Sequence, residues 1–290
     1  MLINLNGKLV DKKDAVVSVF DHGLLYGDGV FEGIRIYSGN IFKLKEHVDR
    51  LFDSAKYIML DIGMTKEKVI KETVRTAAKS GIKNGYIRLV VTRGEGDLGL
   101  DPRKCSKPTY FVIVSTIQLY PEKFYREGLS ITTVAVRRNV NEALNPQVKS
   151  LNYLNNILAK IEANNHGSLE AVMINEQGYV SEATGDNIFI VKNGKLITPP
   201  LFTGVLKGIT RDAVVSIAKK LKIRVSKKVL TRYELYTADE LFMTGTAAEV
   251  IPVVKVDSRL INGGTPGKMT KKLMTEFKKI TKVMGTKVKY

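Results

Sequence analysis

The sequence predicts a mixed α/β (α+β) protein built of two domains. Runs rich in β-branched and aromatic residues, such as YIRLVVTRG and PTYFVIVSTIQL, are typical of strands. Between them, apolar residues spaced three and four apart indicate amphipathic helices. A polar stretch that begins with a proline, at 121–128, separates two such mixed regions. We therefore predict an N-terminal domain over 1–120, a linker over 121–128 and a C-terminal domain over 129–290, long enough together for a sizeable core.

The first domain opens with a strand and a turn at Asn6-Gly7, followed by an extended stretch over 15–20. The glycines of DHGLLYGDGVFEGIRIY are too close together for a helix interior and predict a loop that leads into a strand at 30–37. Apolar stripes predict helices over 44–58 and from Thr65, a candidate N-cap, to Gly81. The two strand-like runs quoted above follow, separated by a loop rich in Gly and Asp.

The second domain begins with the β-rich run SITTVAVRR. A helix is expected over 153–163, followed by hairpin-like pairs with turns at NEQG and KNG. Further amphipathic helices are expected over 210–221 and over 268–284, the second with apolar residues on one face and lysines on the other.

Composition limits the classes of function. The 46 Lys+Arg against 29 Asp+Glu give a formal charge of +17, which raises the question of a nucleic-acid partner. The lysines, however, are spread over the polar faces of the helices and form no known binding module. The single cysteine excludes an internal disulfide, and three scattered histidines offer no metal-binding spacing. Without a secretory signal or an apolar run of about 20 residues, a cytoplasmic, soluble protein with neither metal nor membrane is expected.

Lys149 is the first candidate for chemistry, because it lies among small and amide residues in NPQVKSLNYLNN. Helical periodicity that starts near Ser150, with Leu154, Leu158 and Ile161 apolar, places Lys149 at a helix entrance and Tyr153 one turn further. A lysine in a partly buried site can act as a nucleophile and proton carrier. The alternative is an ordinary surface lysine.

Glu182 is the second candidate. In GYVSEATGDNIFIV, Glu182 and Asn187 flank small residues between two strands. A carboxylate buried there needs a cation or a strong donor, and a protonated pyridine nitrogen of a bound cofactor would serve. An exposed glutamate on a hairpin is the alternative.

Two segments could bind phosphate. Gly208, Ile209 and Thr210 precede a predicted helix, whose first N–H groups attract anions. The small-residue turn around Thr246, in MTGTAAEV, also presents amides and hydroxyls. Arg50, on the polar side of the 44–58 helix, could supply a cation; simple helix caps and a surface salt bridge are the alternatives.

Tyr86 and Arg88 alternate with apolar residues on one predicted strand and so share a sheet face. A guanidinium beside a phenol suits the recognition of a substrate carboxylate. An exposed face of an edge strand would give the same pattern.

Taken together, VFEGIRIY, HVDRL, GYIR, VKSLNYLNN, SEATGDNIF, GITRDAV and TGTAAEV resemble the branched-chain amino acid aminotransferases, which are fold-type IV enzymes that depend on pyridoxal 5'-phosphate. The resemblance implies an active site between two domains and at least a homodimer, in which a loop of the second subunit helps to close the site. It also implies that Lys149 is the catalytic residue and links covalently to the cofactor. The other cofactor-binding positions that it implies are Arg50, Tyr153, Glu182, Asn187, Leu206, Gly208, Ile209, Thr210 and Thr246, and the substrate-binding positions are Tyr26, Phe31, Tyr86, Arg88, Thr246 and Ala247.

The implied reaction is reversible, ping-pong transamination of L-leucine, L-isoleucine and L-valine with 2-oxoglutarate, a step of branched-chain amino acid biosynthesis. Two enzymes of the same fold remain as alternatives, the D-amino-acid aminotransferases and the aminodeoxychorismate lyases. The 95–106 loop has no histidine to match the carboxylate trap of the D-specific enzymes. It also lacks a tryptophan found in some branched-chain enzymes, so this loop leaves the substrate range open.

Overall fold

The computed structural model describes residues 1–290 and divides into two compact units. Unit 1 comprises Met1–Ile117, Val148–Asn152 and Thr281–Tyr290. Unit 2 comprises Gln118–Gln147 and Tyr153–Ile280. The segment with Lys149 and the C-terminal residues therefore pack with unit 1, although we expected both in the C-terminal domain. No helix is long and apolar enough to cross a membrane.

Unit 1 is built on a seven-stranded sheet in which every neighbouring pair of strands is antiparallel. In spatial order the strands are β16 (Gly285–Lys287), β4 (Asn40–Phe42), β3 (Gly29–Tyr37), β5 (Gly85–Thr92), β6 (Thr109–Ser115), β1 (Leu2–Leu5) and β2 (Lys8–Asp11). The short helix α1 (His22–Tyr26) precedes β3, and two 3-10 turns lie at Lys12–Asp14 and Pro102–Lys104. Residues 15–20 form no strand, so the extended stretch expected there is a loop.

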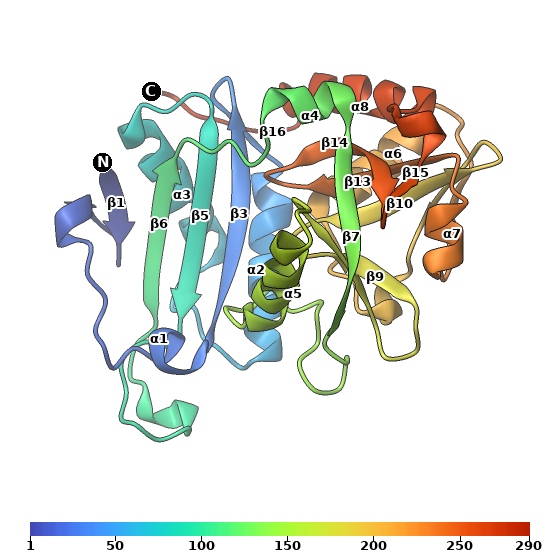
Figure 1. Cartoon of the computed structure of the whole chain (residues 1–290). Helices are drawn as coiled ribbons and strands as arrows, with labels where there is room; N and C mark the ends of the chain where they lie inside the picture. Colours follow the sequence, from blue (N-terminus) through green and yellow to red (C-terminus); the bar gives the residue numbers. More distant parts are fainter. The chain divides into compact units, whose positions relative to one another are not determined.

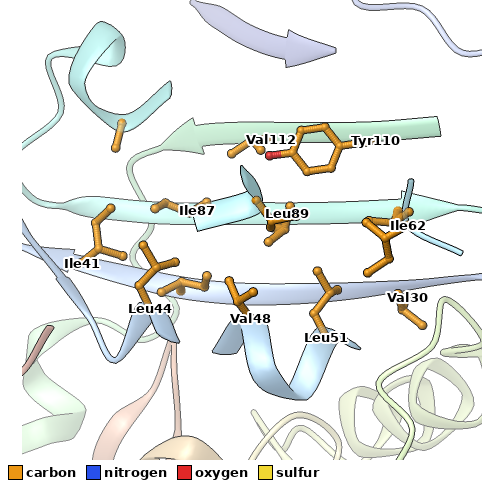
Figure 2. Close-up of a cluster of buried hydrophobic side chains, with 14 of the residues drawn as sticks. Val30, Ile41, Leu44, Val48, Leu51, Ile62, Ile87, Leu89, Tyr110 and Val112 are labelled. Carbon is orange, nitrogen blue, oxygen red and sulfur yellow. The ribbon is translucent and has the colours of Figure 1, made fainter. Parts of the chain in front are cut away.

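Two helices, α2 (Leu44–Tyr57) and α3 (Lys66–Ser80), cover one face of this sheet (Figure 1). Both match the predicted helices, and Thr65 caps α3 with its side chain as expected. Figure 2 shows the resulting core, where Leu44, Val48 and Leu51 of α2 meet Ile87 and Leu89 of β5. Burying each of these side chains contributes about 1.5–3 kcal/mol, so α2 is firmly held against the sheet.

Unit 2 is built on a nine-stranded mixed sheet. The strands run in the order β12 (Val225–Lys227), β11 (Lys195–Thr198), β10 (Asn187–Lys192), β13 (Glu240–Gly245), β14 (Glu249–Val256), β7 (Leu129–Arg137), β8 (Ala171–Ile174) and β9 (Val180–Ala183), with β15 (Arg259–Leu260) beside β14. The pairs β11–β12, β14–β7 and β7–β8 are parallel.

The helices of unit 2 are α4 (Glu122–Glu127), α5 (Leu154–Asn165), α6 (Ile209–Lys220), α7 (Arg232–Tyr236) and α8 (Lys268–Thr281), with 3-10 turns at Leu201–Thr203 and Asn262–Gly264. Helix α4 occupies the segment that we expected to be a linker and packs against β14. Its aromatic residues Phe124 and Tyr125 contact the core, which explains why this polar-looking segment is ordered.

Helix α5 corrects one expectation. It begins at Leu154 rather than near Ser150, and its apolar residues Leu154, Leu158 and Ile161 are exposed. The buried face consists of Ala159, Ala163 and Asn156, because only small side chains fit where α5 packs closely on β7 and β8. The large apolar residues therefore do not mark the core face of this helix.

Candidate functional site

In unit 1, the predicted substrate-binding residues lie on one face of the β3–β5 pair. Gly33 of β3 is opposite Arg88 of β5, and Phe31 is opposite Val90. The guanidinium carbon of Arg88 lies 4.5 Å from the ring centroid of Phe31 and 5.7 Å from that of Tyr86. The structure therefore brings Phe31, Tyr86 and Arg88 together, and the prediction that Tyr86 and Arg88 share a sheet face holds.

Gly33 makes this arrangement possible. A Cβ atom at this position would lie 1.8 Å from the Tyr86 hydroxyl oxygen, so only glycine lets the phenol cross over β3. The conformation of Gly33 is ordinary extended backbone, and the constraint is the close approach of the phenol.

Lys149 lies beside the same group of side chains. Its carbonyl accepts a hydrogen bond from Phe31 N at 3.0 Å, and Leu151 N donates to Gly29 O at 2.9 Å, so this segment continues the sheet along β3. The Lys149 N–H donates to Ser54 Oγ of α2 at 3.1 Å. The ammonium nitrogen is 4.5 Å from the Phe31 ring centroid. Lys149 thus sits on extended backbone, not in the first turn of a helix.

Arg50 is not on a solvated polar face, because it pairs with the fully buried Glu32. Arg50 donates from Nε to Glu32 Oε1 at 2.6 Å and from Nη2 to Oε2 at 2.8 Å. His47, one turn earlier on α2, contacts Glu32 Oε2 through Nδ1 at 2.7 Å. Burial alone would raise the pKa of Glu32, but Arg50 and His47 outweigh it and lower that pKa to about 2.

Sequence reasoning did not find the role of Glu32 or His47. Burial lowers the pKa of His47, so the ring is neutral at pH 7 and donates its Nδ1–H to the ionised carboxylate. The available signal was the spacing of His47 and Arg50 by three residues, which places both side chains on one face of α2. Together with Glu32 they fix the orientation of the Arg50 guanidinium.

Tyr26 ends α1 and is held by the neighbouring loop. Its hydroxyl donates to Leu98 O at 2.5 Å, and its ring meets that of His22 edge-on at 5.0 Å. The His22 ring in turn contacts Asp97 O through Nε2 at 2.7 Å. The 95–106 loop and the segment around Tyr26 therefore form one surface of unit 1.

In unit 2, Glu182 lies at the end of β9 and is 5% exposed. Arg138 donates from Nη2 to Glu182 Oε1 at 2.7 Å. Asn187 Nδ2 and the backbone N–H of Leu206 donate to Oε2 at 2.8 Å and 3.0 Å. The expectation that a buried Glu182 must meet a cation or strong donors is confirmed, and Arg138 is the cation that the sequence analysis missed.

The segment before α6 approaches this carboxylate closely. Asn187 Nδ2 also donates to Leu206 O at 2.9 Å, and a Cβ atom at Gly208 would lie 1.9 Å from Asn187 Oδ1. Gly208 is the N-cap of α6, and no side chain caps the helix there. The first N–H groups of α6, from Ile209 and Thr210, consequently have neither an intrahelical acceptor nor a side-chain cap, as an anion site requires.

The other predicted residues of unit 2 lie at the end of β13 and the start of α5. Thr246 and Ala247 form the turn between β13 and β14 and are half-buried, and Tyr153 is the N-cap residue of α5. Thr244, opposite Asn187 on the sheet, has a buried hydroxyl oxygen without a hydrogen-bond partner. A Cβ atom at Gly245 would lie 1.7 Å from Asp186 Oδ1, so this turn is packed at backbone distance.

This donor set fits pyridoxal 5'-phosphate. The uncapped N-terminus of α6 and the unpartnered Thr244 hydroxyl suit an anionic phosphate, and the Glu182 carboxylate suits a protonated ring nitrogen. In unit 1, the Lys149 amine suits a covalent link and the Arg50 guanidinium suits a negative charge.

Comparison with known proteins identifies the family. Residues 29–256 match the family described as amino-transferase class IV, and this stretch covers most of the chain. The protein therefore belongs to the class IV aminotransferases, and the family resemblance, the two-unit mixed fold and the enzyme class predicted from the sequence are confirmed.

The similar proteins within this family share one name. A protein of Methanocaldococcus jannaschii, provisionally named a branched-chain-amino-acid aminotransferase, is 57% identical over 288 residues, which is 99% of each chain. The structure of the Escherichia coli branched-chain amino acid aminotransferase superposes with a TM-score of 0.94 at 34% identity, over 97% of this chain and 94% of that one.

A third branched-chain amino acid aminotransferase, with its source abbreviated T.th., gives a TM-score of 0.95 at 36% identity, over 99% and 98% of the two chains. Its structures contain pyridoxamine 5'-phosphate, N-(5'-phosphopyridoxyl)-L-glutamate or 4-methylvaleric acid. These ligands, together with the family, confirm the predicted cofactor class.

Proposed function

We propose that the protein is a branched-chain-amino-acid transaminase that uses pyridoxal 5'-phosphate. It transfers the amino group of L-leucine, L-isoleucine or L-valine to 2-oxoglutarate and runs in both directions. The observation that carries this proposal is the buried Glu182 carboxylate, fixed by Arg138, Asn187 and Leu206 in a unit that also offers the uncapped N-terminus of α6.

Each predicted residue takes one role in this chemistry. When bound, the cofactor supplies an electron-accepting ring that stabilises negative charge on the α-carbon of the amino acid. Glu182 holds the proton on the ring nitrogen, assisted by Asn187, while Tyr153 donates to the ring oxygen and Leu206 packs on the ring. The phosphate is bound by Arg50, Gly208, Ile209, Thr210 and Thr246.

Lys149 has two tasks in the proposed reaction. It holds the cofactor through its amine, and once the amino acid has displaced it, the released amine takes the proton from the α-carbon and returns it one position away. The hydrogen bonds of its backbone to Phe31 and Ser54 support this role, because they fix the Cα position from which the side chain reaches.

The face around Phe31 accounts for both substrates. Phe31 and Tyr26 form apolar walls for a branched side chain, and Arg88 with Tyr86 binds a carboxylate, as do Thr246 and Ala247 at the second segment. A guanidinium beside an apolar ring serves leucine and glutamate alternately. The pairing of 4-methylvaleric acid and a glutamate adduct in structures of the T.th. enzyme supports this assignment.

At least a homodimer is part of the proposal. Around Tyr26, apolar side chains of the 95–106 loop and of α1 are exposed to an unusual degree, with Leu24 at 66%, Leu98 at 68% and Leu100 at 79%. A second copy covering this surface would remove it from water and add to the substrate pocket. Light scattering of the purified protein at low concentration is expected to give at least twice the monomer mass.

A coupled assay with 2-oxoglutarate across amino donors tests the function. Turnover is expected with L-Leu, L-Ile and L-Val, with ping-pong kinetics, and none with the Lys149→Ala protein; Lys160→Ala is the matched control and keeps activity. Preference for D-alanine would replace the branched-chain assignment by the D-amino-acid alternative. A fully active Lys149→Ala protein would contradict the mechanism.

A further inference from the structure

Arg138, which no sequence motif pointed to, is the cation that hydrogen-bonds Glu182 in unit 2. It follows β7 directly and is 7% exposed. All three nitrogens of its guanidinium are used, since Nη2 donates to Glu182 Oε1 at 2.7 Å, Nη1 to Asn156 Oδ1 at 3.0 Å and Nε to Gly204 O at 3.1 Å. Arg138 therefore cannot turn away from the carboxylate without losing other buried hydrogen bonds.

Asn156 extends this network to a third segment of the chain. Its Nδ2 donates to Thr184 O at 2.7 Å, two residues after Glu182. The guanidinium and the carboxylate are thus fixed relative to each other both directly and through the amide of Asn156. Such a rigid, well-satisfied pair costs desolvation energy and is a weak source of stability, so a purely structural role explains it poorly.

Two further donors to Glu182 within unit 2 are neutral. Asn187 and the N–H of Leu206 both reach Oε2, while Arg138 reaches Oε1. Arg211, another buried cation on α6, interacts with Glu182 through its charge. Without the Arg138 charge, burial would favour the protonated form of the carboxyl group.

We propose that Arg138 is a positioning residue that keeps Glu182 ionised and correctly oriented before the cofactor binds, so that the carboxylate meets a ring nitrogen that already carries its proton. This inference rests on the proposed function and deepens it. In a protein without Arg138, the carboxyl group would be protonated, and one proton would have to leave it for the buffer whenever a ring that carries an N–H binds.

Calorimetry of the cofactor-free protein measures that proton directly. Pyridoxamine 5'-phosphate is the probe, because it forms no covalent link to Lys149. Titrations in two buffers that differ in ionisation enthalpy give the number of protons released on binding. Relative to the wild type, Arg138→Gln is expected to release about one additional proton near neutral pH and to bind roughly 10- to 100-fold more weakly.

The controls separate charge from packing. Arg138→Lys keeps the cation and is expected to release as few protons as the wild type. Arg137→Gln removes the exposed neighbouring arginine at the end of β7 and is expected to change neither quantity. A merely structural Arg138 would alter the melting temperature and the affinity but not the number of protons released.

Infrared spectroscopy keeps the inference testable if Arg138→Gln does not fold. The difference spectrum of the cofactor-free wild type and Glu182→Gln is expected to show an ionised carboxylate down to about pH 5. A protonated carboxyl band in the wild type, or an unchanged proton release in a folded Arg138→Gln protein, would overturn the inference. Absence of pyridoxamine 5'-phosphate binding by the wild type would instead overturn the proposed function.

Discussion

Two buried carboxylates, Glu32 in unit 1 and Glu182 in unit 2, show how differently one chain uses the same chemical group. Both are almost inaccessible to water and both pair with an arginine. The partners of Glu32, His47 and Arg50, come from one face of α2. Those of Glu182 come from segments near residues 138, 187 and 206, which are far apart in the sequence.

The difference teaches which carboxylate acts on a ligand. Glu32 receives a bidentate guanidinium and an imidazole N–H, which fix Arg50 in place, so its effect on a ligand passes through Arg50. Glu182 is held by a guanidinium and two neutral donors beside glycines at backbone distance from their neighbours, so the carboxylate itself can face a bound ring. We therefore expect substitutions of Glu32 to affect mainly stability and those of Glu182 mainly catalysis.

The largest effect is expected for Glu182→Gln. Because the amide cannot hold a proton on the ring nitrogen, kcat for L-leucine is expected to fall about 10²- to 10⁴-fold, a range typical of a lost proton-transfer partner. Stopped-flow measurement of the first half-reaction checks this. A kcat within a factor of about three of the wild type, with normal folding, would remove Glu182 from the mechanism.

A smaller effect on activity, but a larger one on folding, is expected for Glu32→Gln. The difference between the ordinary pKa of glutamate, 4.5, and about 2 for Glu32 corresponds to about 3 kcal/mol of stability at neutral pH. Urea unfolding of the cofactor-free protein measures this loss. An unchanged unfolding free energy would show that Arg50 and His47 do not stabilise the carboxylate.

The pH dependence of stability sharpens the same contrast. Since the pKa of Glu32 is lowered on folding, its contribution is complete above about pH 4.5 and is lost as the pH falls towards about 2. Burial also lowers the pKa of His47, so folding opposes its protonation and stability starts to fall below about pH 6.5. In Glu32→Gln the acid loss between pH 4.5 and 2 is expected to be shallower.

Substrate recognition gives a prediction of intermediate size. Arg88→Gln removes the guanidinium beside Phe31, so KM for L-glutamate is expected to rise about 10- to 100-fold, and KM for L-leucine by much less. Initial rates with both donors provide the comparison. Equal increases for the two donors would show that Arg88 does not distinguish them.

The smallest effect is expected for Glu72→Gln. Glu72 is a third buried carboxylate, held by Asn4 and Arg75 outside the proposed site. Its loss is expected to cost about 1 kcal/mol in unfolding free energy and to leave kcat unchanged. A fall in kcat comparable to that of Glu182→Gln would end the distinction between buried carboxylates inside and outside the site.

Local patterns predicted much of this molecule. The apolar stripes of α2 and α3, the cap at Thr65 and the alternation of Tyr86 with Arg88 depend on neighbours in the sequence, and the structure contains them all. The requirement that a buried Glu182 must have a cation followed from desolvation energy. Its identity did not, because Arg138 lies 44 residues away and reaches Glu182 only through the pairing of β7, β8 and β9.

Packing explains what the sequence could not show. On α5, alanines face the sheet and the large apolar residues face outward, so periodicity alone indicated the wrong face. Likewise, α4 is ordered by two aromatic residues in a segment that looks like a linker. Glu32 escaped notice because its partners on α2 are as polar as surface residues would be.

The absorption spectrum of the purified protein loaded with pyridoxal 5'-phosphate tests the central claim most directly. The visible band of the bound cofactor is expected to disappear on addition of L-leucine and to return with 2-oxoglutarate, in the wild type and in Glu32→Gln. In Glu182→Gln, the change should be slower by the factor found for kcat. A band that no branched-chain amino acid alters, or one that only D-alanine alters, would contradict the account.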